Sequence, residues 1–201
     1  MSRSYRDTSG VRGLVRTAQV QAAVLMFCLV LAWGEEIVDQ LVFGESLDRF
    51  GVRPRSVPGL WGVLAAPLLH GGWAHLATNT LPFFVLGWLI MLRRVRDFFV
   101  VTALVLLGSG LGVWLIAAPN TVHIGASGVI FGYVGYLLAR GYFERSVWSI
   151  LIALAVAAVY GGALFGLLPG QPGVSWEGHL TGFASGVGSG KLLANRVHKT
   201  A

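Results

Sequence analysis

Two short glycine-framed motifs place a hydroxyl and an imidazole inside apolar segments. Gly125-Ala126-Ser127-Gly128 is followed by Gly178-His179-Leu180-Thr181-Gly182, and the histidine lies 52 residues after the serine. Unpaired polar groups are costly in hydrocarbon, so such side chains usually face a bundle interior and one another. A serine is a weak nucleophile until a nearby base takes its proton. We interpret the pair as a serine hydrolase dyad, with Ser127 as nucleophile and His179 as general base and then acid.

A third set of polar residues has the spacing of a helix face. His75 and Asn79 are four residues apart, so on a helix both point at one centre. Acyl transfer develops an oxyanion, and these two side chains are suitable donors together with the Ser127 backbone N–H; Gly125 is a further candidate. His70 precedes His75 by five residues, about 140° around an ideal helix, so it shares that centre only if the helix begins after it. We treat His70 as a secondary, supporting residue.

Each of these residues also has a structural interpretation. Ser127 has a backbone carbonyl one turn earlier as an alternative partner, and His179 fits a buried histidine that bridges helices. His75 and Asn79 fit interhelical polar contacts. His123 is a rival base four residues before Ser127, but we expect it in an outer turn at the membrane interface. No carboxylate lies where it would orient His179, so we predict a dyad and not a triad.

The composition predicts that membrane helices position these groups. Of 201 residues, 55% are hydrophobic and 12% are charged, and the mean hydropathy is +0.69. A helix needs about 20 residues to cross a bilayer. Six apolar segments are long enough, at residues 18–42, 66–92, 98–118, 124–143, 147–168 and 176–194. We therefore predict an all-α, polytopic bundle of six transmembrane helices, with a membrane domain at 18–194 between tails at 1–17 and 195–201.

The basic residues predict the orientation of this bundle. Twelve of the 15 lysines and arginines fall on one side of the six spans, and cytoplasmic loops carry such an excess. The residues on that side are Arg3, Arg6, Arg12, Arg16, Arg93, Arg94, Arg96, Arg140, Arg145, Lys191, Arg196 and Lys199. Both termini are therefore expected to be cytoplasmic. The net charge of +6 is explained by topology and anionic lipid headgroups, and dispersed basic residues exclude a nucleic-acid partner.

The predicted topology places the polar motifs at one depth. Spans two, four and six all begin on the outer side, and His75, Ser127 and His179 lie near those three starts. The spans also carry glycines at helical spacing, which allow close backbone approach. These glycines are Gly128, Gly132 and Gly135 in span four and Gly178, Gly182, Gly186 and Gly190 in span six. Spans four and six are therefore expected to touch beside the dyad.

Other residues limit the alternatives. Cys28 is the only cysteine, so no intrachain disulfide forms, and its apolar setting favours packing. The histidines do not form a zinc signature such as H-E-x-x-H, so we predict no metal and no cofactor. The acidic residues of span one either line a water-filled path or lie at the outer membrane boundary, which is the simpler account. These acidic residues are Glu35, Glu36 and Asp39.

Together the motifs resemble the rhomboid intramembrane serine proteases. The serine motif of that family corresponds to Gly125-Ala126-Ser127-Gly128, its histidine in the last core span to His179, and its H-x4-H-x3-N element to His70, His75 and Asn79. The resemblance implies a six-helix bundle that cleaves transmembrane segments of other proteins near their outer ends, without ATP or metal. It also implies that Phe131 packs its aromatic ring against the catalytic histidine.

One loop departs from the pattern of that family, and a second loop has two possible roles. The first outer loop lacks, between Gly44 and Gly59, the Trp-Arg pair that some relatives carry. The loop at residues 169–176 is rich in glycine and proline and is either a mobile cap beside the site or a short turn.

The sequence leaves three functional classes to separate. An intramembrane endopeptidase in a bacterial plasma membrane is favoured, with transmembrane proteins as substrates and the lipid bilayer as its surroundings. A noncatalytic protein that binds transmembrane clients is the main alternative, although such a protein would be expected to lose Ser127 or His179. A transporter is disfavoured because the polar residues gather at one point instead of lining a path.

Overall fold

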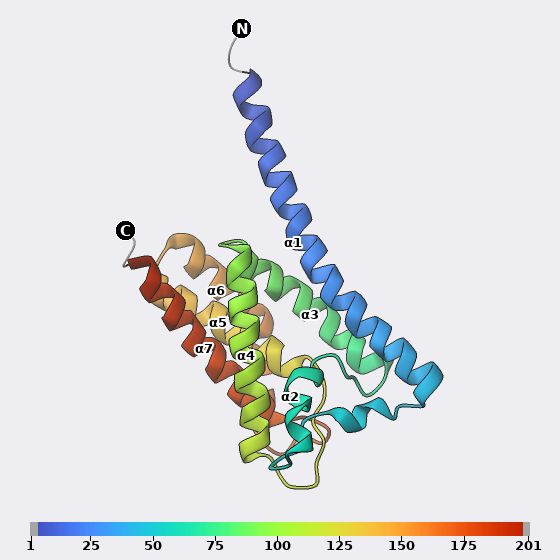
Figure 1. The fold of residues 1–201 in the computed structure, drawn as a ribbon. Helices are drawn as coiled ribbons and strands as arrows, with labels where there is room; N and C mark the ends of the chain where they lie inside the picture. The colour runs from blue at the N-terminus through green and yellow to red at the C-terminus, as the bar shows by residue number, and fades with distance from the viewer. Residues whose placement is uncertain (1–3, 199–201) are drawn as a thin grey trace.

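Six long helices and one short helix form the fold. The computed structural model describes residues 4–198, and within them there is no β-strand (Figure 1). The helices are α1 (Ser4–Val38), α2 (Gly62–Ala65), α3 (Trp73–Met91), α4 (Val95–Ile116), α5 (Ser127–Glu144), α6 (Val147–Tyr160) and α7 (Trp176–His198). Shorter turns are η1 (Asp39–Phe43), η2 (Leu47–Phe50), η3 (Pro58–Leu60) and η4 (Gly161–Leu167). The predicted all-α class is confirmed.

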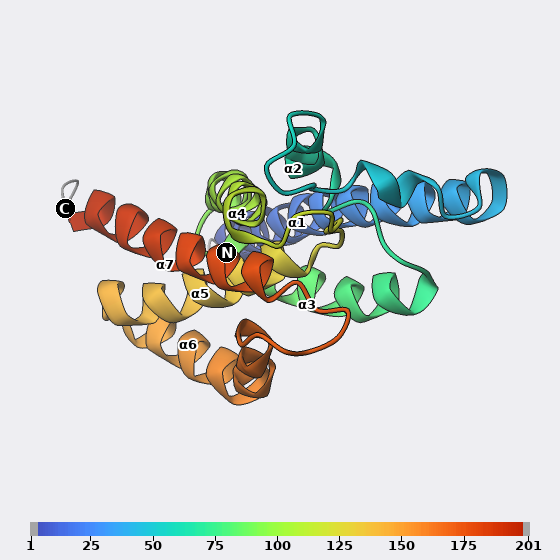
Figure 2. The ribbon, with the colours of Figure 1, turned by 90° about the horizontal axis from the view of Figure 1, so that it is seen from below.

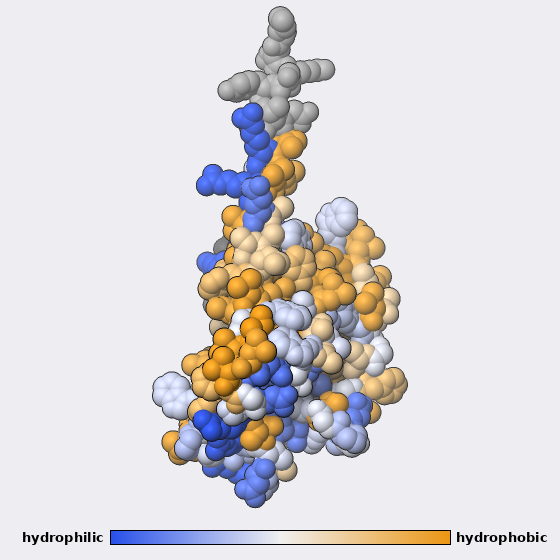
Figure 3. Space-filling model, turned by 90° about the vertical axis from the view of Figure 1, so that its right-hand side faces the viewer, coloured by the Kyte–Doolittle hydropathy of each residue, from blue (hydrophilic) through white to orange (hydrophobic). Residues whose placement is uncertain are grey.

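Four segments are long and apolar enough to cross a membrane: Gly10–Phe43, Trp73–Met91, Val95–Ile116 and Val147–Leu167. On the face seen in Figure 3, hydrophobic side chains form a band across the bundle, and hydrophilic side chains gather below it and along one side of the part of α1 that projects above it. These features are those of an integral membrane protein. α5 and α7 are the other long helices, and α5 is largely enclosed by neighbours, so its outer face need not be apolar. Six crossings remain the prediction.

The helices do not begin and end where predicted spans one, two and six do. α1 begins at Ser4, well before residue 18, and α7 continues past residue 194 to His198; residues 1–3 and 199–201 lie outside the described part. Span two was expected from residue 66, but α3 begins only at Trp73. The reason is Gly72, whose φ of 97° is incompatible with a continuing right-handed helix. His70 therefore lies in a loop before α3.

α5 is the central helix and packs closely against α7. Figure 2 shows α5 between α6, α7 and α3, and it also contacts α4. A Cβ atom at Gly182 would collide with the carbonyl oxygen of Gly128, and one at Gly186 with that of Gly132. Glycine is required at these contacts because the two backbones touch. The predicted contact between spans four and six is confirmed, and it brings the starts of α5 and α7 together.

α3, α5 and α7 all begin at the same end of the bundle, which we call the site end (Figure 1). The first described turn of α1 and the last turn of α7 lie toward the opposite end. At the site end lies an acidic cluster: Glu35 and Glu36 at the end of α1, Asp39 at the start of η1, and Glu45 and Asp48 in the turns that follow. Glu36 and Asp39 are buried, and Asp39 accepts the N–H of Leu47 at 2.9 Å. Burial, reinforced by Asp39 and Glu36, raises the pKa of Asp48 to about 6.

The opposite end is held by a buried ion network. Arg93, in the turn after α3, pairs with Asp97 of α4 at 3.1 Å and with Glu144 of α5 at 3.2 Å. Arg140 of α5 also pairs with Glu144, at 2.8 Å. Two of the arginines counted for the orientation, Arg93 and Arg140, are therefore neutralised by partners. The network links three helices at one point.

Replacing Glu144 by alanine is expected to destabilise the bundle. The change leaves two largely buried guanidinium groups without their shared carboxylate, and breaking a buried pair from one side costs about 3–5 kcal/mol. The unfolding free energy in detergent, measured by denaturant titration, reports the loss. Arg145→Asn is the matched control: Arg145 is exposed, and asparagine tolerates its left-handed φ of 53°. Equal stability of both variants would show that the network contributes nothing.

Candidate active site

Ser127 is the first residue of α5, and a strained glycine places it there. Gly125 has a φ of 104°, and its N–H donates to the carbonyl of Ala66 at 2.8 Å. A Cβ atom at Gly125 would lie 2.7 Å from the ring of His75. Glycine is thus needed both for the backbone conformation and for the approach of that ring. As the first helical residue, Ser127 has a backbone N–H with no carbonyl partner inside α5.

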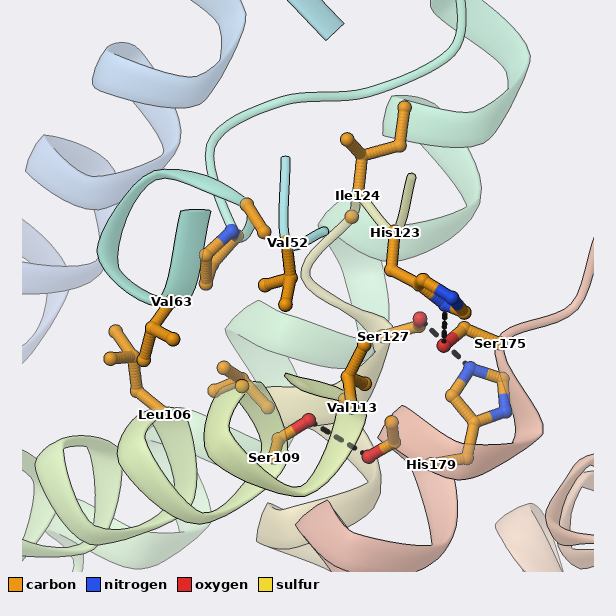
Figure 4. Close-up of a pocket in the computed structure, with 17 residues that line it drawn as sticks. Val52, Val63, Leu106, Ser109, Val113, His123, Ile124, Ser127, Ser175 and His179 are labelled. Atoms are coloured by element: carbon orange, nitrogen blue, oxygen red, sulfur yellow. Dashed lines mark hydrogen bonds between the residues drawn. The ribbon is translucent and has the colours of Figure 1, made fainter. Parts of the chain in front are cut away.

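His179 lies in the first turn of α7 and faces Ser127. Its Nε2 atom is 2.8 Å from the Ser127 hydroxyl oxygen (Figure 4), and its Nδ1 atom is 2.9 Å from the carbonyl oxygen of Gly166. A carbonyl only accepts, so Nδ1 carries the proton and donates it to Gly166. Nε2 is then the free acceptor for the Ser127 proton. The arrangement holds the imidazole in the tautomer that a general base requires.

The ring of Phe131 fixes the plane of the imidazole. Its centroid lies 4.1 Å from that of His179, with an angle of 16° between the rings. Phe131 is buried one helical turn after Ser127 on α5, and Gly166 lies close to both rings. His179 is therefore held by a stacked ring on its face and by a backbone carbonyl at one edge. The predicted contact of Phe131 with His179 is present.

His75 and Asn79 lie across an open cleft from the dyad. The cleft has a volume of about 670 Å³, and its walls include His75, Asn79, Ser127 and His179. The N–H of Gly71 donates to His75 Nδ1 at 3.3 Å, which leaves the proton of His75 on Nε2. The Asn79 amide donates one N–H to the carbonyl of His75 at 3.0 Å and retains a second. The cleft thus has donors on the side opposite His179.

His70 lies close to the same centre, although in the loop before α3. Its Nδ1 donates to the carbonyl of Leu68 at 3.1 Å, and its Nε2 accepts the N–H of Ala126 at 3.4 Å. Its ring is 5.0 Å from that of His75. Burial lowers the pKa of His70 to about 4, so the ring is neutral at physiological pH and remains an acceptor. His70 holds the residue that precedes Ser127.

Two parts of the site were not expected from the sequence. Gly166 orients His179 through its main-chain carbonyl, which any residue provides, so the sequence holds no signal for it. Ser109 of α4 donates to the carbonyl of Gly178 at 2.8 Å and accepts, through its own carbonyl, from Thr181. Ser109 stands between Gly108 and Gly110 in an apolar segment, which resembles the glycine context of Ser127. That context could have identified Ser109 as a buried polar residue with a partner on another helix.

Groups of three or more metal-binding side chains are not found among residues 10–194, whose side chains the structure describes. The prediction that the chain uses no metal or cofactor stays a prediction. The chemistry available from the described side chains is proton transfer between a hydroxyl and an imidazole, with N–H donors opposite.

Comparisons with known proteins place this arrangement in one family. Residues 58–196 match the Rhomboid domain, and this range includes all the site residues described above. An uncharacterized protein of Mycobacterium tuberculosis is 45% identical over 183 residues, which cover 87% of this chain and 76% of that protein. RHOMBOID-like protein 4 of Arabidopsis thaliana is 32% identical over 69% of this chain and 35% of its own length. Rhomboid-like protease 5 of Toxoplasma gondii is 29% identical over 69% of this chain and 16% of its own length. The chain is a member of the rhomboid family of helical membrane proteins.

Proposed function

We propose that this protein is an intramembrane serine endopeptidase with Ser127 as nucleophile and His179 as general base. The observation that carries the proposal is the 2.8 Å contact between Ser127 Oγ and His179 Nε2, with Nδ1 held by the Gly166 carbonyl. A hydroxyl that only needed a partner would be satisfied by a backbone carbonyl one turn earlier in the chain. Here it is paired instead with the basic nitrogen of an oriented imidazole.

The proposed reaction proceeds by two acyl transfers. His179 takes the proton of Ser127 as the oxygen attacks a peptide carbonyl, and it returns the proton to the leaving amine. The tetrahedral oxyanion lies toward the Ser127 backbone N–H, His75 Nε2 and the free N–H of Asn79. Water then enters from the cleft and attacks the acyl carbonyl as His179 takes its proton, and His179 returns that proton to the Ser127 oxygen as the ester bond breaks. No cofactor takes part in these steps.

Transmembrane segments of other proteins are the proposed substrates. The site lies near the starts of three helices and not at mid-bundle, so cleavage is expected near one membrane boundary of the substrate. With both termini cytoplasmic, this is the extracytoplasmic boundary of a bacterial plasma membrane. Carbonyls in an intact helix are hydrogen-bonded and shielded, so the substrate must unwind locally. Small or helix-breaking residues near the scissile bond should favour cleavage.

The test compares wild type with Ser127→Ala in liposomes that contain a model transmembrane substrate. Wild type is expected to release products whose termini, read by mass spectrometry, map near one membrane boundary, and to react with a fluorophosphonate probe. Ser127→Ala is expected to lose both reactions. Ser56→Ala removes a hydroxyl outside the dyad and should behave as wild type. Cleavage or labelling that persists in Ser127→Ala would reject the assignment. Absence of both reactions in folded wild type would favour the noncatalytic client-binding alternative.

A further inference from the structure

His123 joins three segments at the site end. Its backbone forms an isolated antiparallel bridge with Val52, with N···O distances of 2.9 and 3.0 Å. Its Nε2 atom is 2.8 Å from the hydroxyl oxygen of Thr121, and its Nδ1 atom is 2.6 Å from that of Ser175. Thr121 donates its own proton to the carbonyl of Ala118, so it accepts from His123 Nε2. His123 Nδ1 is then the acceptor of the Ser175 proton.

Ser175 is the residue that ties the last loop to the rest of the bundle. Residues 168–173 are exposed, and both Gly170 and Gly173 have positive φ. The side chain of Gln171 bonds to Phe165 of the preceding turn, and the backbone of Val174 bonds to Gln171. Among hydrogen bonds of residues 169–175 in the described part of the chain, the Ser175–His123 bond alone reaches the segment between α4 and α5. Its loss would leave this loop tethered only by its ends.

The same serine borders the first turn of α7. Its carbonyl accepts the N–H of His179 at 3.0 Å, and the helix begins at the next residue, Trp176. Figure 4 shows the His123–Ser175 bond beside the Ser127–His179 bond, and all four residues line the same pocket. The end of a helix frays unless it is restrained, and fraying affects the first turn most. His179 lies in that turn.

We propose that His123 and Ser175 are a positioning pair that holds the first turn of α7, so that His179 stays within reach of Ser127. Both residues border the cleft, but neither side chain bonds to the Ser127 hydroxyl or to the imidazole of His179. Val52 anchors His123 through the backbone, His123 anchors Ser175 through its side chain, and Ser175 fixes the His179 amide. Burial lowers the pKa of His123, which favours the neutral, accepting ring despite the carboxylate of Glu177 nearby. This inference rests on the proposed function.

The test measures kcat, KM and the rate of fluorophosphonate labelling in four variants. Ser175→Ala, His123→Phe and the double variant are each expected to lower kcat and the labelling rate by roughly tenfold, with KM changed less than twofold. A displacement of the base by a fraction of an ångström has effects of this size. Both single variants remove the bond between Ser175 and His123. The double variant should therefore be no slower than the slower single variant. Ser175→Thr keeps the hydroxyl and should recover most of the rate.

Gln171→Ala is the matched control, since it removes a hydrogen bond within the same loop that does not reach His123. It should match wild type in all three measurements. A fall in kcat/KM for the large substrate with an unchanged labelling rate would overturn the proposal, because the pair would then act on substrate entry. Additive losses in the double variant would also overturn it.

Hydrogen exchange separates this inference from the proposed function. The amides of residues 174–180 are expected to exchange faster in Ser175→Ala and His123→Phe than in wild type and Gln171→Ala, whether or not the protein cleaves anything. Unchanged exchange would refute the positioning role even in an active enzyme. Inert wild type with faster exchange in these variants would refute the proteolytic function and leave the structural link standing.

Discussion

His179→Ala is expected to lower the kcat of substrate cleavage by about 10³-fold or more. General base catalysis contributes about 10²–10⁴-fold, and the same histidine also protonates the leaving amine here. Ser127 then retains its place on α5 but has no acceptor at 2.8 Å for its proton. The labelling rate with a fluorophosphonate should fall by a similar factor, because the probe needs the same activated oxygen. Single-turnover cleavage in liposomes measures the chemical step directly.

Phe131→Leu provides the graded control for that result. Leucine keeps an apolar side chain beside the imidazole but removes the ring stacked at 4.1 Å. The bond from Nδ1 to Gly166 remains, so we expect a loss of roughly tenfold, well short of the loss in His179→Ala. A His179→Ala variant as active as Phe131→Leu would show that another group takes the Ser127 proton. His123 would not be that group, since its ring nitrogens already bond to Thr121 and Ser175.

The fold was largely predictable because helices leave a periodic pattern in the sequence. The residues of the site were largely predictable because they stand in short motifs. Apolar segments of membrane length predicted the helices, and glycines spaced by four predicted where α5 and α7 touch. Where helices begin was less predictable. Span two was expected from residue 66, but α2 ends at Ala65, and the positive φ of Gly72 keeps residues 66–72 out of α3. His70 therefore lies in a loop and not in the expected span, and its ring reaches Ala126 from there.

The connections between the site residues were not predictable from the sequence. The orientation of His179 depends on a main-chain carbonyl at Gly166, which has no side-chain identity. Arg93 and Arg140 were counted toward the basic excess on one side of the bundle, and the sequence did not predict that Glu144 lies within 3.2 Å of both. His123 lies in the turn before α5, as expected, but the sequence did not predict its side-chain bonds to Thr121 and Ser175. In each case a long-range contact decides the role, and spacing along the chain does not encode it.

His75→Ala and Asn79→Ala are each expected to lower kcat by about 10²–10³-fold while KM changes little. Removal of one donor from an oxyanion site has this effect in serine proteases, because the bond strengthens only as negative charge develops. His75 Nε2–H and the second Asn79 N–H both border the cleft opposite the dyad. An interaction confined to the transition state lowers kcat and kcat/KM equally. Steady-state kinetics with the liposome substrate measures both.

Two further variants decide whether donation is the property that matters. Asn79→Asp keeps the shape of the side chain but replaces the N–H donors with oxygens, so it should be at least as slow as Asn79→Ala. Thr78→Ala lies on the same wall of the cleft, but its hydroxyl donates to the His75 carbonyl of its own helix, and it should match wild type. A raised KM with unchanged kcat in the Asn79 variants would place Asn79 in ground-state substrate binding. The backbone N–H of Ser127 and His75 would then hold the oxyanion without it.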